Sequence, residues 1–241
     1  MKRLLLVINP YSGFGKCAFT QVFVEHLSRK GISHAMATSV EENAASDAEV
    51  WDLDEELNTE HLLSFLDDGP IGVIDAPVSD AEQIIEFIQE SGFVDSLADV
   101  DAEMTMVLTV SDEQESVERM VRLAEDLADG AQYLAVHEMD MEESNWAGSY
   151  GEKVMNYLGA AEVEVPGIEE EILSSLEESH EMTLSQALAE RKMLPRFLRD
   201  GLHRWELEFA DNLEECSDIL VPEDAEDRSV YVSGKGSGIT R

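Results

Sequence analysis

Residues 3–31, RLLLVINPYSGFGKCAFTQVFVEHLSRKG, contain the pattern that decides the fold. The apolar run Leu4–Ile8 predicts a buried strand, and a glycine-containing turn follows it. After the turn, apolar residues recur at helical spacing until Gly31, namely Phe19, Val22, Phe23 and Leu27. A strand, a Gly-Lys turn and a helix in this order favour phosphate binding, because the turn directs backbone N–H groups and the positive end of a helix at one point.

The candidate phosphate contacts are the residues of the turn and of the first helical turn: Ser12, Gly13, Phe14, Gly15, Lys16, Cys17 and Ala18. Lys16 would reach the β- and γ-phosphates of a nucleotide, so it is also a catalytic candidate. Cys17 stands where a Ser or Thr would hold Mg²⁺, and a thiol is a poor ligand for this hard cation. Pro10 stands where G-x-x-x-x-G-K has its first glycine. An ordinary strand-to-helix turn is the alternative interpretation.

Three acidic residues lie at predicted strand ends. Asp75 follows an apolar run in IGVIDAP (71–77), where a carboxylate could anchor Mg²⁺ through water, so we assign it as the metal residue. Asp52 and Asp54 end the strand predicted at 50–54, and either carboxylate could orient a water or a metal, which makes both catalytic candidates. The alternatives are a cap or turn for Asp75, and chance in an acidic chain for the pair.

The remaining pattern alternates between strands and helices. Strands are predicted at 32–38, 50–54, 71–77, 104–110, 133–139 and 161–166, and helices at 59–66, 80–91, 111–128, 152–158, 168–175 and 183–192, with a long helix through Trp205 and Phe209. This order predicts an α/β fold with a doubly wound, mostly parallel sheet of the P-loop type and a C-terminal helical segment. We expect one domain over 1–221, with the C-terminal helices from about 168, and a disordered acidic, Gly- and Ser-containing tail over 222–241.

The charge of the chain restricts its partners. The 241 residues include 53 acidic and 16 basic side chains, and the formal net charge is −37. Direct DNA binding is not expected, because it depends on Lys and Arg that neutralise phosphates. No apolar run approaches the length of a membrane span, and the N-terminal apolar patch lacks a signal-peptide pattern. The two cysteines, Cys17 and Cys216, have no metal-type spacing, so we expect a reduced cytoplasmic protein.

One stretch is densely basic. It contains Arg191, Lys192, Arg196, Arg199, His203 and Arg204, with Phe197, Leu198, Leu202 and Trp205 between them. The helical spacing favours an amphipathic helix whose apolar side packs on the sheet while its basic side pairs with the acidic surface. The alternative is a docking face for an acidic partner or nucleic acid.

Three segments in sequence order, NPYSGFGKC, VWDLD and IGVIDAP, resemble the ParA/MinD-like P-loop ATPases. MTMVLTVSDEQESVERMVRLAEDL is similar to the strand and helix that follow in that family, and VIN…SGxGK looks closest to its TraL/StbB-like branch of conjugation and plasmid-stability proteins. The resemblance covers about residues 1–210. It departs at Tyr11, where the family has a lysine that reaches the nucleotide of a dimer partner.

The resemblance implies a nucleotide-binding protein of plasmid maintenance or conjugative transfer. Because Tyr11 and Cys17 depart from the family pattern, we expect weak binding of ATP or ADP, poor Mg²⁺ binding, and slow or absent hydrolysis. A protein partner is expected, and a homodimer is one form of it. The alternative is a non-catalytic pseudo-ATPase scaffold. A small-molecule kinase or ligase is a third option, without an acceptor-site signature in the sequence.

Overall fold

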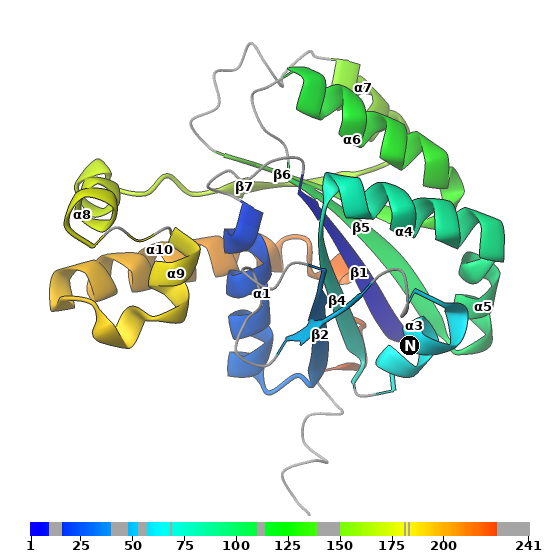
Figure 1. The fold of residues 1–241 in the computed structure, drawn as a ribbon, viewed down its shortest axis with the longest axis horizontal. Helices are drawn as coiled ribbons and strands as arrows, with labels where there is room; N and C mark the ends of the chain where they lie inside the picture. The colour runs from blue at the N-terminus through cyan, green and yellow to red at the C-terminus, as the bar shows by residue number, and fades with distance from the viewer. Residues whose placement is uncertain are drawn as a thin grey trace, which may run out of the picture.

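A single parallel sheet forms the centre of the molecule. The computed structural model describes residues 1–9, 16–39, 48–52, 57–67, 69–109, 114–138, 150–180, 182 and 184–225. In this part of the chain, seven strands pair in the order β3-β2-β4-β1-β5-β6-β7, and every pairing is parallel (Figure 1). The strands are β1 Lys2–Asn9, β2 His34–Thr38, β3 Glu49–Val50, β4 Ile71–Pro77, β5 Ala102–Thr109, β6 Gln132–Glu138 and β7 Ala161–Val165.

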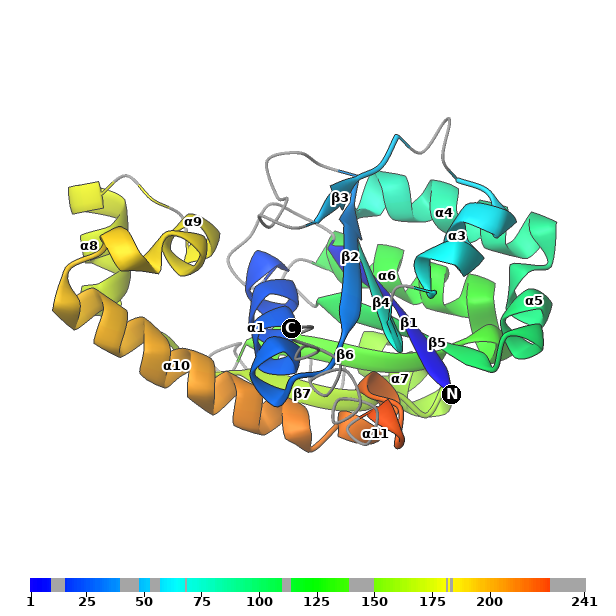
Figure 2. The same cartoon turned by 90° about the horizontal axis from the view of Figure 1, so that it is seen from below.

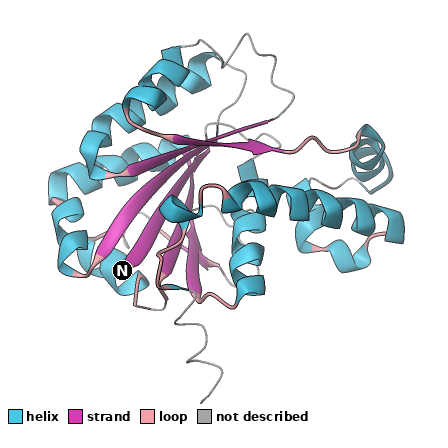
Figure 3. Cartoon of the chain, turned by 180° about the vertical axis from the view of Figure 1, so that it is seen from behind, coloured by secondary structure: helices cyan, strands magenta, loops and turns pink. Residues whose placement is uncertain are grey.

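Helices cover both faces of this sheet (Figure 3). One face packs against α3 Thr59–Phe65, α4 Val78–Ser91, α5 Phe93–Asp99, α6 Gln114–Leu127 and α7 Tyr150–Tyr157. The other packs against α1 Lys16–Lys30, α10 Arg196–Glu214 and α11 Ser217–Leu220. Two short 3₁₀ helices are η2 Ala128–Gly130 and η3 Arg191–Met193. The doubly wound parallel sheet and the C-terminal helical segment predicted from the sequence are therefore confirmed.

The central position of β1 explains its continuous apolar sequence. Its side chains alternate between the two faces, so Leu4, Leu6 and Ile8 enter one core while Leu5 and Val7 enter the other. β4 and β5 flank β1, with Val7 opposite both Asp75 and Val107. A strand that is buried on both faces needs apolar residues at every position, which is the pattern typical of parallel sheets.

The C-terminal helices extend beyond the sheet as a lobe. It consists of α8 Glu170–His180, α9 Leu184–Ala189 and the first half of α10 (Figures 1 and 2). The predicted amphipathic helix is confirmed, because Leu198, Leu202 and Trp205 are buried and the Trp205 Nε1–H donates to the Pro166 carbonyl at 2.6 Å. Gly201 lets α8 approach α10 closely, since a Cβ at this position would lie 2.3 Å from Ile172 Cδ1.

Most predicted boundaries agree with the structure to within a few residues, and β4 agrees at both ends. β3 is shorter than the predicted 50–54, since it ends at Val50. α4 begins at Val78 rather than Asp80, because Pro77 is its N-cap. α5 was not predicted from the sequence, and it follows α4 directly through Gly92 at φ 66°. Ser111, the first residue of the helix predicted at 111–128, lies outside the described residues.

The first residues of the predicted tail belong to the packed domain. Within 222–225, Pro222 and Ala225 are buried, and an Asp224 carboxylate oxygen lies 3.4 Å from the N-terminal amino group of Met1. Residues 226–241 of the tail lie outside the described residues.

Candidate functional site

The candidate site lies where the carboxyl ends of the central strands meet. β1 ends at Asn9 and α1 begins at Lys16, so the predicted phosphate loop joins this edge to the N-terminus of α1. The loop residues Ser12, Gly13, Phe14 and Gly15 lie outside the described residues. Lys16, Cys17 and Ala18 form the first helical turn, and their side chains also lie outside the described part of the structure.

α1 is held firmly behind this edge. Phe19 is fully buried and stacks on Phe23, with ring centroids 5.7 Å apart, and its ring meets that of Phe209 edge-on at 6.4 Å. Aromatic contacts of this kind contribute about 0.5–1.5 kcal/mol each beyond the burial of their area. The N-terminus of α1 is therefore anchored by packing one turn behind the predicted loop.

Asp75 is the predicted site residue that the structure describes most fully. Its side chain is 3% exposed, and the residue lies opposite Val7 of β1 and Thr38 of β2. Because side chains alternate along a strand, Asp75 lies on the same face as Ile71 and Val73, which pack in the core formed with α1. Burial of an ionised carboxylate is costly unless partners compensate it, so a buried acid at a strand end is typical of a functional position.

The position of Asp75 argues against its role as a cap of α4. That helix packs on the opposite face of the sheet through Ala81 and Ile84, and Pro77 is its N-cap. The structure thus places the Asp75 carboxylate on the face of the sheet that α1 covers, next to β1, which leads into the predicted loop.

The pair predicted at the end of the third strand does not lie beside Asp75. Asp52 is exposed and follows Trp51, whose backbone N–H donates to the Thr38 carbonyl at 2.9 Å. Because β2 lies between β3 and β4, Asp52 is separated from Asp75 by two strand steps, about 10 Å. Asp54 lies outside the described residues. The structure therefore brings together Asp75 and the loop ends, but not Asp52.

Two threonines at this edge were missed by the sequence analysis. Thr38 and Thr109 are the last residues of β2 and β5, and both are buried. The Thr109 hydroxyl donates to the Ile8 carbonyl at 3.3 Å, which ties the end of β5 to β1. A hydroxyl at the last position of a buried strand is the signal that could have identified them.

The side chains at this edge limit the kind of metal site that the protein can form. No group of three or more His, Cys, Asp or Glu side chains that could hold a metal occurs among the described residues. Asp75 alone fits a cation held partly by water and by phosphate oxygens, as is usual for Mg²⁺. Asp75 therefore suits a metal ion that is bound together with a nucleotide better than a metal ion held by several protein side chains.

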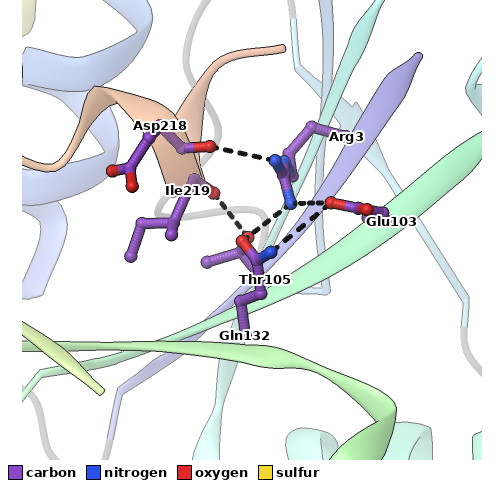
Figure 4. Close-up of polar contacts among 6 residues, drawn as sticks. All are labelled: Arg3, Glu103, Thr105, Gln132, Asp218 and Ile219. Carbon is purple, nitrogen blue, oxygen red and sulfur yellow. Dashed lines mark hydrogen bonds and ion pairs between the residues drawn. The ribbon is translucent and has the colours of Figure 1, made fainter. Parts of the chain in front are cut away.

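The opposite edge of the sheet has a structural polar cluster. Arg3 is buried, and its guanidinium donates to Glu103 at 2.8 Å, to Gln132 at 2.9 Å and to the Asp218 carbonyl at 3.1 Å (Figure 4). Burial lowers the pKa of Arg3, and Glu103 opposes this shift. The Thr105 hydroxyl also donates to the Ile219 carbonyl. These bonds fix α11 against the amino ends of the strands.

A surface pocket of about 280 Å³ lies near that edge, between α1, α10 and α11. Its lining includes His26, Lys30 and Glu214, with His26 Nε2 3.2 Å from a Glu214 oxygen and Lys30 paired with the same carboxylate. His26 and Lys30 belong to the C-terminal half of α1, so this pocket is distinct from the predicted loop. Among the described residues, no helix is long and apolar enough to cross a membrane.

Comparisons with known proteins give only distant likenesses. No protein-family model and no curated protein sequence matches the chain. The MinC:MinD cell division protein complex of Aquifex aeolicus has a similar structure, with a TM-score of 0.47 and 11% identity over 99% of this chain and 98% of that chain. The signal recognition particle 54 kDa protein of Aeropyrum pernix K1 in complex with GDP gives a TM-score of 0.44 and 15% identity, over 91% of this chain and 51% of that chain. FlhF complexed with GTP and Mg²⁺ gives a TM-score of 0.38 and 17% identity, over 68% of this chain and 65% of that chain. TM-scores this low assign neither a family nor a function to this chain.

Proposed function

We propose that this chain is a ParA/MinD-like nucleotide-binding protein that holds phosphate groups in the loop between β1 and α1. The observation that carries the proposal is the position of Asp75, which is buried next to β1 on the face covered by α1. A phosphate loop needs a helix N-terminus for the anion and a nearby acid for its cation, and these two parts occur at one edge.

The roles of the loop residues follow from their chemistry. The backbone N–H groups of Ser12–Ala18 would surround the phosphates, and Lys16 would neutralise the β- and γ-phosphates of ATP or ADP. Asp75 would hold Mg²⁺ through water. Cys17 offers the cation no oxygen ligand, and Tyr11 supplies no positive charge, so the bound state is expected to be weak and hydrolysis slow or absent.

The biological process is proposed from the sequence resemblance alone. Plasmid maintenance or conjugative transfer is the process of the TraL/StbB-like branch, and a protein partner would read the nucleotide state there. Partition or transfer genes beside the gene for this chain would support that process, and an unrelated neighbourhood would remove it.

A pseudo-ATPase scaffold is the second candidate, favoured by the two departures at Tyr11 and Cys17. Such a protein would keep the fold and act through protein contacts. The two candidates differ in one measurable property, which is equilibrium affinity for a nucleotide.

Calorimetric titration of the full chain with ATP and with ADP tests the proposal. We expect weak binding that is lost in Lys16→Ala and retained in the control Lys153→Ala, because Lys153 is exposed on α7. Asp75→Asn should remove the part of the affinity that depends on Mg²⁺, and Cys17→Thr should increase that part. An absence of binding up to about millimolar nucleotide would leave only the scaffold candidate.

A further inference from the structure

The outer face of α10 has an unusual second seam. Its inner face packs on the domain through Leu198, Leu202, Trp205, Phe209 and Leu213. On the outer face, alternate spacings of three and four residues connect Phe197, Asp200, Arg204, Leu207 and Asp211. Phe197 is 54% and Leu207 41% exposed. A surface helix needs one apolar stripe, so two exposed large apolar side chains on a second seam with heptad spacing indicate a further contact.

The same outer face is divided by charge. Its N-terminal half contains Arg196, Arg199, His203 and Arg204 together with Asp200, and its C-terminal half contains Glu208 and Asp211. Arg199 forms no ion pair with the described residues. In Figure 2, α10 lies along the outside of the molecule, with α1, α8 and α9 on its inner side. On the seam itself, Asp200 and Arg204 carry opposite charges about one helical turn apart. Two copies of the helix therefore place Asp200 opposite Arg204 when they run antiparallel, whereas parallel helices would place like charges opposite each other.

We propose that α10 pairs antiparallel with α10 of a second copy of this chain, about a twofold axis that crosses the outer face at the level of residue 202. In this register, Phe197 lies opposite Leu207 of the second copy, and Asp200 lies opposite its Arg204. Every pair is repeated by the symmetry, as an isologous interface requires. The contact does not depend on nucleotide binding.

The existing ion pairs of these residues do not prevent the contact. Arg196 pairs with Asp200 at 3.3 Å, and Arg204 pairs with Glu169 at 3.2 Å. All four side chains are more than 60% exposed, so these pairs contribute little to stability and can be exchanged. The apolar layers of Phe197 and Leu207 would supply the attraction, and the ion pairs would set the register.

The net charge of −37 predicts an unusual salt dependence. Two copies repel one another over a distance that falls from about 30 Å at 0.01 M salt to about 3 Å at 1 M. The apolar layers act only in contact and do not weaken with salt. Dimerisation should therefore strengthen as salt increases. In this register the two helices overlap only over residues 196–208, which gives a small interface, so the dimer belongs to the weak, transient class.

Sedimentation equilibrium of the full chain from about 10 µM to about 0.5 mM, in about 0.5 M NaCl, tests the contact. We expect a monomer–dimer equilibrium in the wild type. Asp200→Arg places like charges opposite each other, and so does Arg204→Asp. The dissociation constant of the dimer should therefore rise at least about tenfold in each variant alone. The two variants mixed together should regain wild-type association, because each copy then offers the charge that the other lacks.

Two control variants carry the same charge changes elsewhere. Asp95→Arg on α5 and Arg122→Asp on α6 alter exposed residues on the opposite face of the sheet, and both should dimerise like the wild type. Circular dichroism confirms that each variant is folded.

Three results would overturn the proposal. The first is a wild-type chain that stays monomeric throughout this range. The second is a dimer that Asp200→Arg and Arg204→Asp leave unchanged, which would place the contact on another surface. The third is a loss in the single variants that mixing does not restore, which would mean that Asp200 and Arg204 do not face each other across the contact.

Discussion

The buried Glu206 and the half-buried Arg191 form an ion pair that joins the C-terminal lobe to the domain. Arg191 Nη1 donates to Glu206 Oε2 at 2.6 Å, and Glu206 is 3% exposed. The second carboxylate oxygen of Glu206 lies 3.3 Å from Arg29 Nη2, so α1 and η3 both bind α10 through one acid. Arg191 also lies 3.1 Å from Glu25 of α1. The helix that follows the predicted loop is thereby tied to the base of the lobe.

Replacement of Glu206 by Gln should destabilise the protein by about 2–3 kcal/mol. The change keeps the shape but leaves Arg29 and Arg191 without the carboxylate that compensates their partial burial. Urea unfolding followed by circular dichroism measures the loss. The control is Glu90→Gln on the exposed side of α4, which should change stability by no more than about 0.5 kcal/mol. Equal effects of the two changes would mean that the Glu206 pairs contribute no net stability.

The hydrogen bonds of Arg3 should hold α11 in place against the sheet. Arg3→Ala removes the donors to Glu103, Gln132 and the Asp218 carbonyl, so α11 should separate from the amino edge before the sheet unfolds. Hydrogen exchange should accelerate at residues 217–220 while β1 and β5 remain protected. Lys2→Ala is the control, because the Lys2 ion pair that the described residues contain is with the exposed Asp67 and does not involve α11. Uniform acceleration across the domain would contradict a local role for Arg3.

Gly201 should tolerate alanine poorly although it lies inside a helix. Alanine normally stabilises such a position by about 1 kcal/mol, but its Cβ would lie 2.3 Å from Ile172 Cδ1. We expect a net loss of about 1–2 kcal/mol. The double variant Gly201→Ala with Ile172→Val removes the clashing methyl group and should recover part of the loss. A stabilised single variant would show that α8 moves away from α10 at little cost.

The sequence predicted those parts of the fold that depend on local pattern. β4 was predicted at both ends because Gly69-Pro70 and Pro77 bound its apolar run. α5 was missed because its seven residues offer few repeats of the helical period, and only the positive φ of Gly92 separates it from α4. β3 was overextended because Trp51 looks like a strand residue but packs its ring against His61 and Phe65 instead.

The candidate site was predictable only in part. Asp75 could be placed beside the loop because the carboxyl ends of parallel strands meet at one edge of a sheet. The distance between Asp52 and Asp75 could not be predicted, because it depends on the strand order. Thr38 and Thr109 carry no motif. Glu206 could not be recognised as buried, because in a chain with 53 acidic residues a glutamate in a helix is indistinguishable from a solvated one until the tertiary contacts are known.

His26 should make the stability depend on pH in the neutral range. Burial lowers the pKa of His26 below its ordinary value of 6.5, the positive charges of Lys30 and Arg29 act in the same direction, and the acids Glu214 and Asp211 oppose the shift. The folded state therefore binds its proton less readily than the unfolded state. Stability is complete above the unfolded pKa and decreases as the pH falls through 6.5 toward the lower folded pKa.

The measurement is the urea midpoint at a pH above 6.5 and at a pH about one unit below it, where most carboxylates remain ionised. We expect the wild-type midpoint to fall with pH, and the fall to shrink in His26→Gln, which cannot be protonated in this range. His34→Gln is the matched control, because His34 contacts the Ile32 carbonyl away from this pocket. The same decrease in His26→Gln as in the wild type would assign the pH dependence to other groups. A midpoint that rises as the pH falls would mean that Glu214 outweighs burial and raises the pKa of His26 instead.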